Sequence, residues 1–269
     1  MNTRRRVLRG LTSILGLGAT GAWATDEATL EQNRNQWLRY MLTNFDNSKF
    51  NISKAPTIDD KVCILTQSQV EGPYLTSAPT RSDVTEGKPG APFELTVQVV
   101  ASDGCTPLPG VMLEIWHCDA AGNYSGHPKL ARDVFASLEY LEWSPGHKEP
   151  MNHESWLRGV QKTDDNGTVT FRTIFPGWYD MRAPHIHLKI GGPQRELFTS
   201  QLYFDDATAN DLYRNHPDYK AYGECPYRPE NDAVINRVGG AAGLLLDVRK
   251  LDSGTMQASA KVGIELPAA

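Results

Sequence analysis

The chain has 269 residues, of which 40% are hydrophobic and 22% are charged, and its formal net charge at pH 7 is -5. This length and hydrophobic content suit a globular protein with one large domain or two small ones. The acidic balance, with a pI near 5.8, offers no basic excess for a nucleic-acid partner.

Residues 1–24 are typical of a twin-arginine export signal. Arginines at positions 4 to 6 precede an apolar, glycine-containing run to Ala22, and residues 22–24 have the small-x-small pattern of a cleavage site. The run is too short to span a membrane. We therefore expect a periplasmic or secreted protein, exported in folded form, a route that suits a protein loaded with metal. An N-terminal anchor and a simple basic start are the alternatives, and the sequence does not decide whether the signal is cleaved.

Apolar side chains recur at helical spacing over residues 26–45, which predicts an amphipathic helix. We expect its apolar stripe to pack against the main domain, and a contact between two copies in a homodimer is the alternative. Residues 25–269 are expected to form a single domain with this helix as an extension. The stripe consists of Leu30, Trp37, Leu38, Met41, Leu42 and Phe45.

Alternation of apolar and polar residues dominates the chain after residue 92. Residues 93–99 and 111–116 both alternate and are joined by a turn at 103–110, so we expect them to pair as a hairpin. The expected fold is mainly β, an antiparallel β-sandwich of about seven strands with long loops that build the site. Other expected strands lie near residues 62–65, 168–172, 185–190, 197–204, 244–251 and 256–266, with a short polar helix or loop at 205–222.

Four cysteines follow the export signal: Cys63, Cys105, Cys118 and Cys225. An even number of cysteines in an exported chain favours disulfides over a thiolate metal site, and no CxxC spacing is present. Four cysteines allow three pairings, and the sequence does not choose among them. Buried thiols are the alternative.

The segment FPGWYDMRAPHIHLKI, residues 175–190, places two histidines in an alternating pattern. Side chains two residues apart on a strand share a face, so His185 and His187 point to one side, about 7 Å apart by strand rise. Their apolar neighbours take the opposite face. On its own, this pair fits either half of a metal site or two histidines that only pack and hydrogen-bond.

Two tyrosines at strand ends could complete such a site. Tyr124 lies in the polar loop after the strand that ends in IWHC, and Tyr179 stands in the turn before the HIH strand. Tyrosine has a pKa near ~10, so it binds metal as phenolate only beside a strongly charged cation, which favours ferric iron over zinc or calcium. Two phenolates and one hydroxide would cancel the charge of that ion, whereas neutral imidazoles add none.

In this combination, the chain resembles the intradiol ring-cleavage dioxygenases of the exported, single-chain kind. The matching segments are EGPY at 71–74, DGCTPLPGVMLEIWHCDAAGNYSGH at 103–127, FPGWYDMRAPHIHLKI at 175–190 and SQLYF at 200–204. The resemblance implies one non-haem Fe(III) per chain on a β-sandwich. The ligands it implies are Tyr124, Tyr179, His185 and His187.

The resemblance also implies residues that act on the substrate. Arg182 resembles the family arginine that faces the substrate ring, and Gln201 resembles a pocket glutamine near the iron. Tyr74 is expected to line the pocket, and Tyr179 to leave the metal and act as a base. The other histidines match no ligand position, although His117 and His127 flank the Tyr124 loop and are expected next to the site.

The implied reaction joins O2 to a catechol-type aromatic and cleaves it between its two hydroxyl-bearing carbons, which gives a muconate-type diacid. The link from Tyr179 to His185 is shorter than in the cytoplasmic catechol and protocatechuate enzymes, so their ring preferences do not carry over. One alternative is a non-catalytic exported protein that binds a metal or a catecholate on the same fold. Another is a transthyretin-like adhesion domain.

Overall fold

The structure, a computed structural model, describes most of the chain after residue 50. Among these residues it has ten strands in two sheets and one α-helix, which confirms the prediction of a mainly β sandwich. The predicted export signal and the predicted helix over 26–45 lie outside the described residues. The described residues are 51–60, 63–102, 104–127, 147–179, 181–192, 195–232, 234–235 and 240–266.

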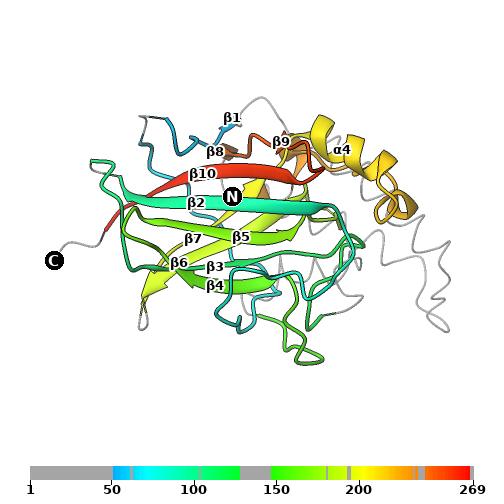
Figure 1. Ribbon diagram of the computed structural model, residues 1–269, viewed down its shortest axis with the longest axis horizontal. Coiled ribbons are helices and arrows are strands. Elements are labelled where there is room, and N and C mark those ends of the chain that lie inside the picture. Colours follow the sequence, from blue (N-terminus) through cyan, green and yellow to red (C-terminus); the bar gives the residue numbers. More distant parts are fainter. Residues whose placement is uncertain are drawn as a thin grey trace, which may run out of the picture. The chain divides into compact units, whose positions relative to one another are not determined.

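The larger sheet has six strands in the order β1-β8-β7-β6-β3-β4. The smaller sheet has four strands in the order β5-β2-β10-β9. Figure 1 shows β5, β2 and β10 side by side in one layer, with β6 and β7 crossing behind it. The bounds are β1 (Asn51–Lys54), β2 (Pro92–Ala101), β3 (Met112–Trp116), β4 (Arg158–Lys162), β5 (Thr168–Ile174), β6 (His185–Gly192), β7 (Arg195–Tyr203), β8 (Gly240–Leu245), β9 (Arg249–Lys250) and β10 (Met256–Ile264).

Strand direction and pairing differ from the expectation in two respects. Both sheets are mixed, because β2 pairs in parallel with β10, and β8 pairs in parallel with β1 and β7. The predicted hairpin is wrong: β2 lies in the smaller sheet, while β3 pairs with β4 and β6 in the larger one. Alternation in the sequence predicts which side chains of a strand face the core, but it does not predict which strand pairs with it.

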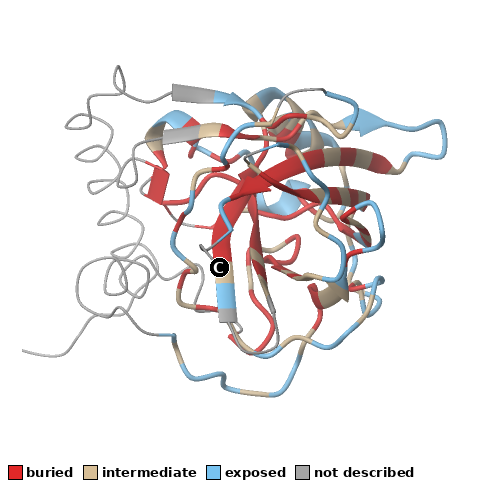
Figure 2. Cartoon of the chain, turned by 90° about the vertical axis from the view of Figure 1, so that its left-hand side faces the viewer, coloured by how far each residue is buried: buried red, intermediate tan, exposed pale blue. Residues whose placement is uncertain are grey.

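The core lies between the two sheets. Every second residue of β2 is almost fully buried, and the aromatic ring of Phe93 packs 5.9 Å from Phe175 and 5.6 Å from Phe204, measured between centroids. Burial of such side chains is the main stabilising contribution to a sandwich. Figure 2 shows the buried residues concentrated along the long strands, with exposed residues mostly in the connections.

Helix α4 (Asp206–Asn215) follows β7 directly and begins with a side-chain cap, in which Asp205 accepts a hydrogen bond from the Thr208 amide at 2.9 Å. Its buried Tyr213 hydroxyl donates to the Pro176 carbonyl at 2.9 Å, so the helix supports the turn before β6. Two 3-10 turns follow, η2 (Lys220–Tyr222) and η3 (Pro229–Asn231). No helix in the described part of the chain has the length and apolar character to cross a membrane.

The cysteines divide between the two outcomes that the sequence left open. Cys63 and Cys105 form a disulfide. Cys118 and Cys225 are buried thiols, with the Cys118 Sγ 3.4 Å from the Gly177 carbonyl oxygen. The disulfide closes a loop of 42 residues near the start of the described chain, and such a cross-link restricts the unfolded state.

Candidate metal centre

The two histidines of β6 lie on the outer face of the six-stranded sheet. Ile186, Leu188 and Ile190 alternate with them and are completely buried in the core. His185 and His187 are each 2% exposed, and their Nε2 atoms approach to 3.1 Å. The rings therefore converge much more closely than the spacing along the strand requires.

Tyr124 reaches this face from the loop between β3 and β4. The Asp119 carboxylate folds the loop by accepting hydrogen bonds from the amides of Ala121 and Asn123, both at 3.0 Å. Arg158 of β4 supports the same loop: its Nε donates to the Ser125 hydroxyl at 2.7 Å, and its guanidinium carbon lies 5.9 Å from the Tyr124 ring centroid.

Gly177 joins the Tyr124 loop to the turn that carries Tyr179. Its amide donates to the Asp119 carbonyl at 3.1 Å, and a Cβ atom at this position would lie 2.5 Å from the carbonyl oxygens of Asp119 and Ala120. A side chain would therefore push the two loops apart. The glycine allows the backbone contact that places Tyr124 and Tyr179 together.

Four side-chain atoms meet at one point: the hydroxyls of Tyr124 and Tyr179 and the Nε2 atoms of His185 and His187. Tyr179 lies 3.0 Å from His185, Tyr124 lies 3.2 Å from His187 and 3.4 Å from His185, and the two hydroxyls are 3.5 Å apart. Atoms with these separations surround a common centre at about 2 Å, the usual length of a metal bond to nitrogen or oxygen. The predicted ligand set is thus brought together.

The protonation states at this site suit a metal-binding role. Burial lowers the pKa of both histidines well below the usual range, so both imidazoles are neutral and able to coordinate. Burial raises the pKa of Tyr179 to about 12 and that of Tyr124 well above 10. Without a cation, both phenols hold their protons, and only a strongly charged ion would convert them to phenolates.

The second nitrogen of each imidazole also bears on metal binding. The Nδ1 atom of His185 lies 2.6 Å from the Ala183 carbonyl, an interaction that leaves Nε2 as the coordinating atom. The buried Nδ1 of His187 finds no hydrogen-bond partner among the described residues, and its ring lies flat against Trp116. No three His, Cys, Asp or Glu side chains in the described part of the chain form a metal-binding group, and the candidate site here combines two histidines with two tyrosines.

Arg182 lies beside the four donor atoms. Its Nη1 is 3.4 Å from both the Tyr179 hydroxyl and the His185 Nε2, and Nε donates to the Asp232 carboxylate at 2.9 Å. Burial opposes the charged guanidinium most strongly, but Asp232 and the neighbouring tyrosines together outweigh it and raise the arginine pKa above its ordinary value. Met181 has a φ of +67°, in the left-handed region, within the turn that returns Arg182 toward Tyr179.

Gln201 lies opposite His187 in the pairing of β6 and β7. Its Oε1 accepts from the Arg182 Nη2 and from the Tyr203 hydroxyl, and its Nε2 donates to the Val70 carbonyl at 2.8 Å. Both ends of the amide are therefore engaged within the protein. In this arrangement Gln201 orients Arg182.

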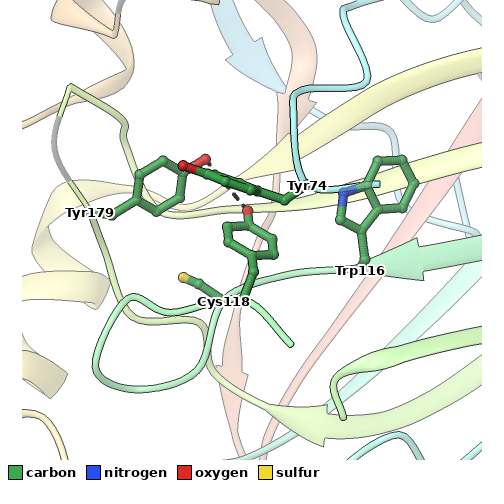
Figure 3. Packing of buried hydrophobic residues seen from close by; sticks show 5 residues of the cluster. Tyr74, Trp116, Cys118 and Tyr179 are labelled. Atoms are coloured by element: carbon green, nitrogen blue, oxygen red, sulfur yellow. Dashed lines mark hydrogen bonds between the residues drawn. The ribbon is translucent and has the colours of Figure 1, made fainter. Parts of the chain in front are cut away.

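Tyr74 lies over the site, in the turn formed by residues 71–74. Its ring stacks on Tyr124 with centroids 4.9 Å apart, and Figure 3 shows it reaching toward Tyr179 in the same cluster. Lys189 and His147 both bond the Glu71 carboxylate and hold the start of this turn. A Cβ atom on Gly72 would lie 3.1 Å from the His187 ring, so the turn packs directly on that proposed ligand.

Sequence reasoning missed several of the site's supporting residues. Trp116 and Tyr203 could have been found, because alternation places them on the same sheet face as the histidines. Asp232 has no such signal, since it lies in a segment without a periodic pattern. Of the two histidines expected nearby, His127 is buried with its ring 5.3 Å from Tyr74, whereas His117 bonds the Cys118 carbonyl and Thr173 instead.

The curated proteins that match the chain are distant relatives, and those described here are ring-cleaving 1,2-dioxygenases. No family model matches the chain. It is 27% identical over 198 residues to a catechol 1,2-dioxygenase from Pseudomonas sp. (strain EST1001), a match that covers 59% of this chain and 58% of the relative. It is 25% identical over 166 residues to a chlorocatechol 1,2-dioxygenase from Rhodococcus opacus, covering 52% and 56%. The chain thus spans little more than half the length of these relatives.

A solved structure shares both the fold and some of the sequence. An intradiol ring-cleavage dioxygenase from Tetranychus urticae matches with a TM-score of 0.64 and 27% identity, over 77% of this chain and 97% of that one. The family typically uses non-haem ferric iron. On this evidence the chain is a distant homologue of the intradiol ring-cleavage dioxygenases, with similarity to catechol and chlorocatechol 1,2-dioxygenases.

Proposed function

We propose that the chain is a non-haem ferric dioxygenase that uses O2 to cleave catechol-type aromatics between the two hydroxylated carbons. Both oxygen atoms of O2 enter the product, a muconate-type diacid. The observation that carries this proposal is the convergence of two buried phenols and two neutral imidazoles, with neighbouring donor atoms 3.0–3.5 Å apart. The family relationship supports the same activity.

Tyr124, Tyr179, His185 and His187 would hold one ferric ion. The ion, when bound, would draw electron density from a catechol and make its ring reactive toward O2. The four side chains are almost fully buried, so they exclude bulk water from the centre. Low solvent exposure strengthens every electrostatic interaction within the site.

Two side chains have the positions needed for proton transfer and charge stabilisation. The Tyr179 Oη, which would be a phenolate in the ferric protein, would accept a proton from a catechol hydroxyl. The Arg182 Nη1 lies 3.4 Å from that same oxygen and carries a fixed positive charge. It would stabilise negative charge that develops on the substrate as oxygen adds. Gln201 would act on the substrate through Arg182.

Tyr74 is our candidate for substrate contact outside the ligand set. Its ring is 1% exposed and stacks on Tyr124, so it presents an aromatic surface at the centre. Aromatic rings favour such offset or tilted contacts with other rings. We also propose that the protein is exported, since the disulfide between Cys63 and Cys105 suits an oxidising compartment.

Oxygen consumption tests the proposed activity. Iron-loaded protein and catechol are mixed under air, with O2 uptake and the ring-opened diacid measured together. The proposal predicts one O2 consumed per diacid formed, and Arg182→Gln should reduce the rate by about 100-fold or more, as removal of a preorganised charge does elsewhere. Tyr222→Phe changes an exposed tyrosine of η2 and serves as the control. Catechol binding without O2 uptake would identify a carrier protein instead.

A further inference from the structure

Asp232 is a completely buried carboxylate next to the candidate metal centre. It lies 50 residues after Arg182 in the sequence and directly after η3. Its Oδ2 accepts from the Arg182 Nε at 2.9 Å and from the Ala183 amide at 2.7 Å. Its Oδ1 accepts from the amides of Val234 and Ile235 at 2.9 and 3.0 Å. Each oxygen thus has a separate set of partners.

The contacts of Asp232 determine where the Arg182 guanidinium can point. Asp232 holds Nε, and Gln201 holds Nη2, so two sides of the planar group are fixed. The remaining nitrogen, Nη1, lies 3.4 Å from both the Tyr179 hydroxyl and the His185 Nε2. A guanidinium held at two of its nitrogens has little freedom to rotate away from the centre.

The charge of Asp232 matters as well as its geometry. Arg182 is only 6% exposed, and a buried cation without a partner is strongly unfavourable. Asp232 cancels that charge on the side away from the donor atoms, so the guanidinium can remain close to them. A neutral residue at this position would favour an arginine that turns toward water.

We propose that Asp232 is a positioning residue that aims the Arg182 Nη1 at the reacting centre. This inference rests on the proposed function and adds Asp232, which lies 50 residues after Arg182, to the residues that serve the reaction. Asp232 does not touch the donor atoms in any contact described above, so its effect on the reaction passes through Arg182. The two hydrogen bonds that Oδ1 accepts from backbone amides contribute to stability, and this contribution can be measured separately from kcat.

The test is a double-mutant cycle with Asp232→Asn and Arg182→Gln in the iron-loaded protein. Asp232→Asn should lower kcat by about 10- to 100-fold with a smaller change in KM, a typical cost of losing a supporting partner. It should also shift the phenolate-to-iron absorption band, which Arg182 perturbs through Tyr179. In the Arg182→Gln background, Asp232→Asn should change neither kcat nor the band.

Two further variants separate positioning from stability. Asp232→Ser retains a hydroxyl that can accept from the Val234 and Ile235 amides but cannot reach Arg182, and it keeps the test available if the asparagine variant does not fold. Asp205→Asn alters another carboxylate that accepts from a backbone amide, at the start of α4, and should lower the melting temperature slightly with kcat unchanged.

Four outcomes would count against the proposal. Equal losses of kcat in both Arg182 backgrounds, or a wild-type kcat and band in Asp232→Asn, would overturn the positioning role while leaving the dioxygenase intact. A loss confined to melting temperature in the asparagine and serine variants would also overturn it. A wild-type protein that binds no iron would overturn the proposed function and this inference together.

Discussion

Trp116 lies flat against His187: the ring centroids are 4.7 Å apart and the planes differ by 7°. The two residues are directly opposed in the pairing of β3 and β6. Stacking on Trp116 is one contact that orients the imidazole, whose Nδ1 finds no hydrogen-bond partner among the described residues. The pairing of the two strands therefore controls how one proposed ligand faces the centre.

Replacing Trp116 with alanine should affect both stability and metal retention. Loss of a fully buried indole is expected to lower the free energy of unfolding by about 3–5 kcal/mol. The released His187 ring should also weaken iron binding by about 10- to 100-fold, as loss of a ligand's supporting partner commonly does. Urea unfolding and iron content after dialysis against a chelator measure the two effects.

Trp156→Ala is the matched control for that variant. Trp156 belongs to a separate buried cluster with Leu157 and Ile174. It should lose stability and keep its iron. If both tryptophan variants lose iron equally, the loss reflects general destabilisation and the stacking contact has no special effect on His187.

A methyl group at position 177 should separate the two loops that carry the tyrosines. Gly177→Ala places a Cβ atom 2.5 Å from two backbone oxygens, and neither can move without displacing the Tyr124 loop. We expect a loss of about 1–3 kcal/mol in unfolding free energy, typical of overpacking, together with weaker iron binding. In the control Gly104→Ala, the nearest atom to the new Cβ would be 3.8 Å away, so the unfolding free energy should stay within about 1 kcal/mol of the wild-type value. Equal unfolding free energies and equal iron binding in the two variants would show that the close contact at Gly177 does not hold the loops together.

His117 should make the protein less stable in mild acid. Burial lowers its pKa from 6.5 to about 4, so between these values the unfolded chain takes up a proton that the folded chain does not. The stabilisation is therefore complete above pH 6.5 and decreases as the pH falls toward 4, by roughly 3 kcal/mol in total. Urea unfolding of the wild type and of His117→Gln across this range measures it.

The difference between those two proteins isolates the effect of His117. Glu114 acts in the opposite sense, since burial raises its pKa to about 7 and its contribution decreases as the pH rises from 4.5 to 7. Both proteins contain Glu114, so its contribution cancels in the comparison. A His117→Gln slope equal to the wild type would contradict the assignment.

Alternation in the sequence was sufficient to place the histidines. It correctly separated His185 and His187 from Ile186 and Leu188, because one face of β6 must enter the core. The choice of Tyr124 and Tyr179 came from the chemistry of phenolate ligands and from the family resemblance. The structure brings these four side chains together, and their role as iron ligands remains a prediction.

Contacts between segments that lie far apart in the chain could not be predicted from the sequence. Nothing in the alternation of β2 and β3 shows that they belong to different sheets, because any apolar face can be covered by either sheet. The same limit applies to Asp232, whose single buried carboxylate meets Arg182 only once the segment after η3 folds against the turn before β6. Long-range contacts of this kind depend on the topology of the whole sandwich.

Iron titration with optical detection tests the proposed metal centre. The reconstituted wild type should bind one iron per chain and show a red-brown phenolate-to-iron absorption band. Tyr124→Phe should lose most of that absorption and release its iron on dialysis, whereas Tyr222→Phe, which changes an exposed tyrosine of η2, should retain both. A wild-type protein that remains colourless after reconstitution would contradict the proposed metal centre.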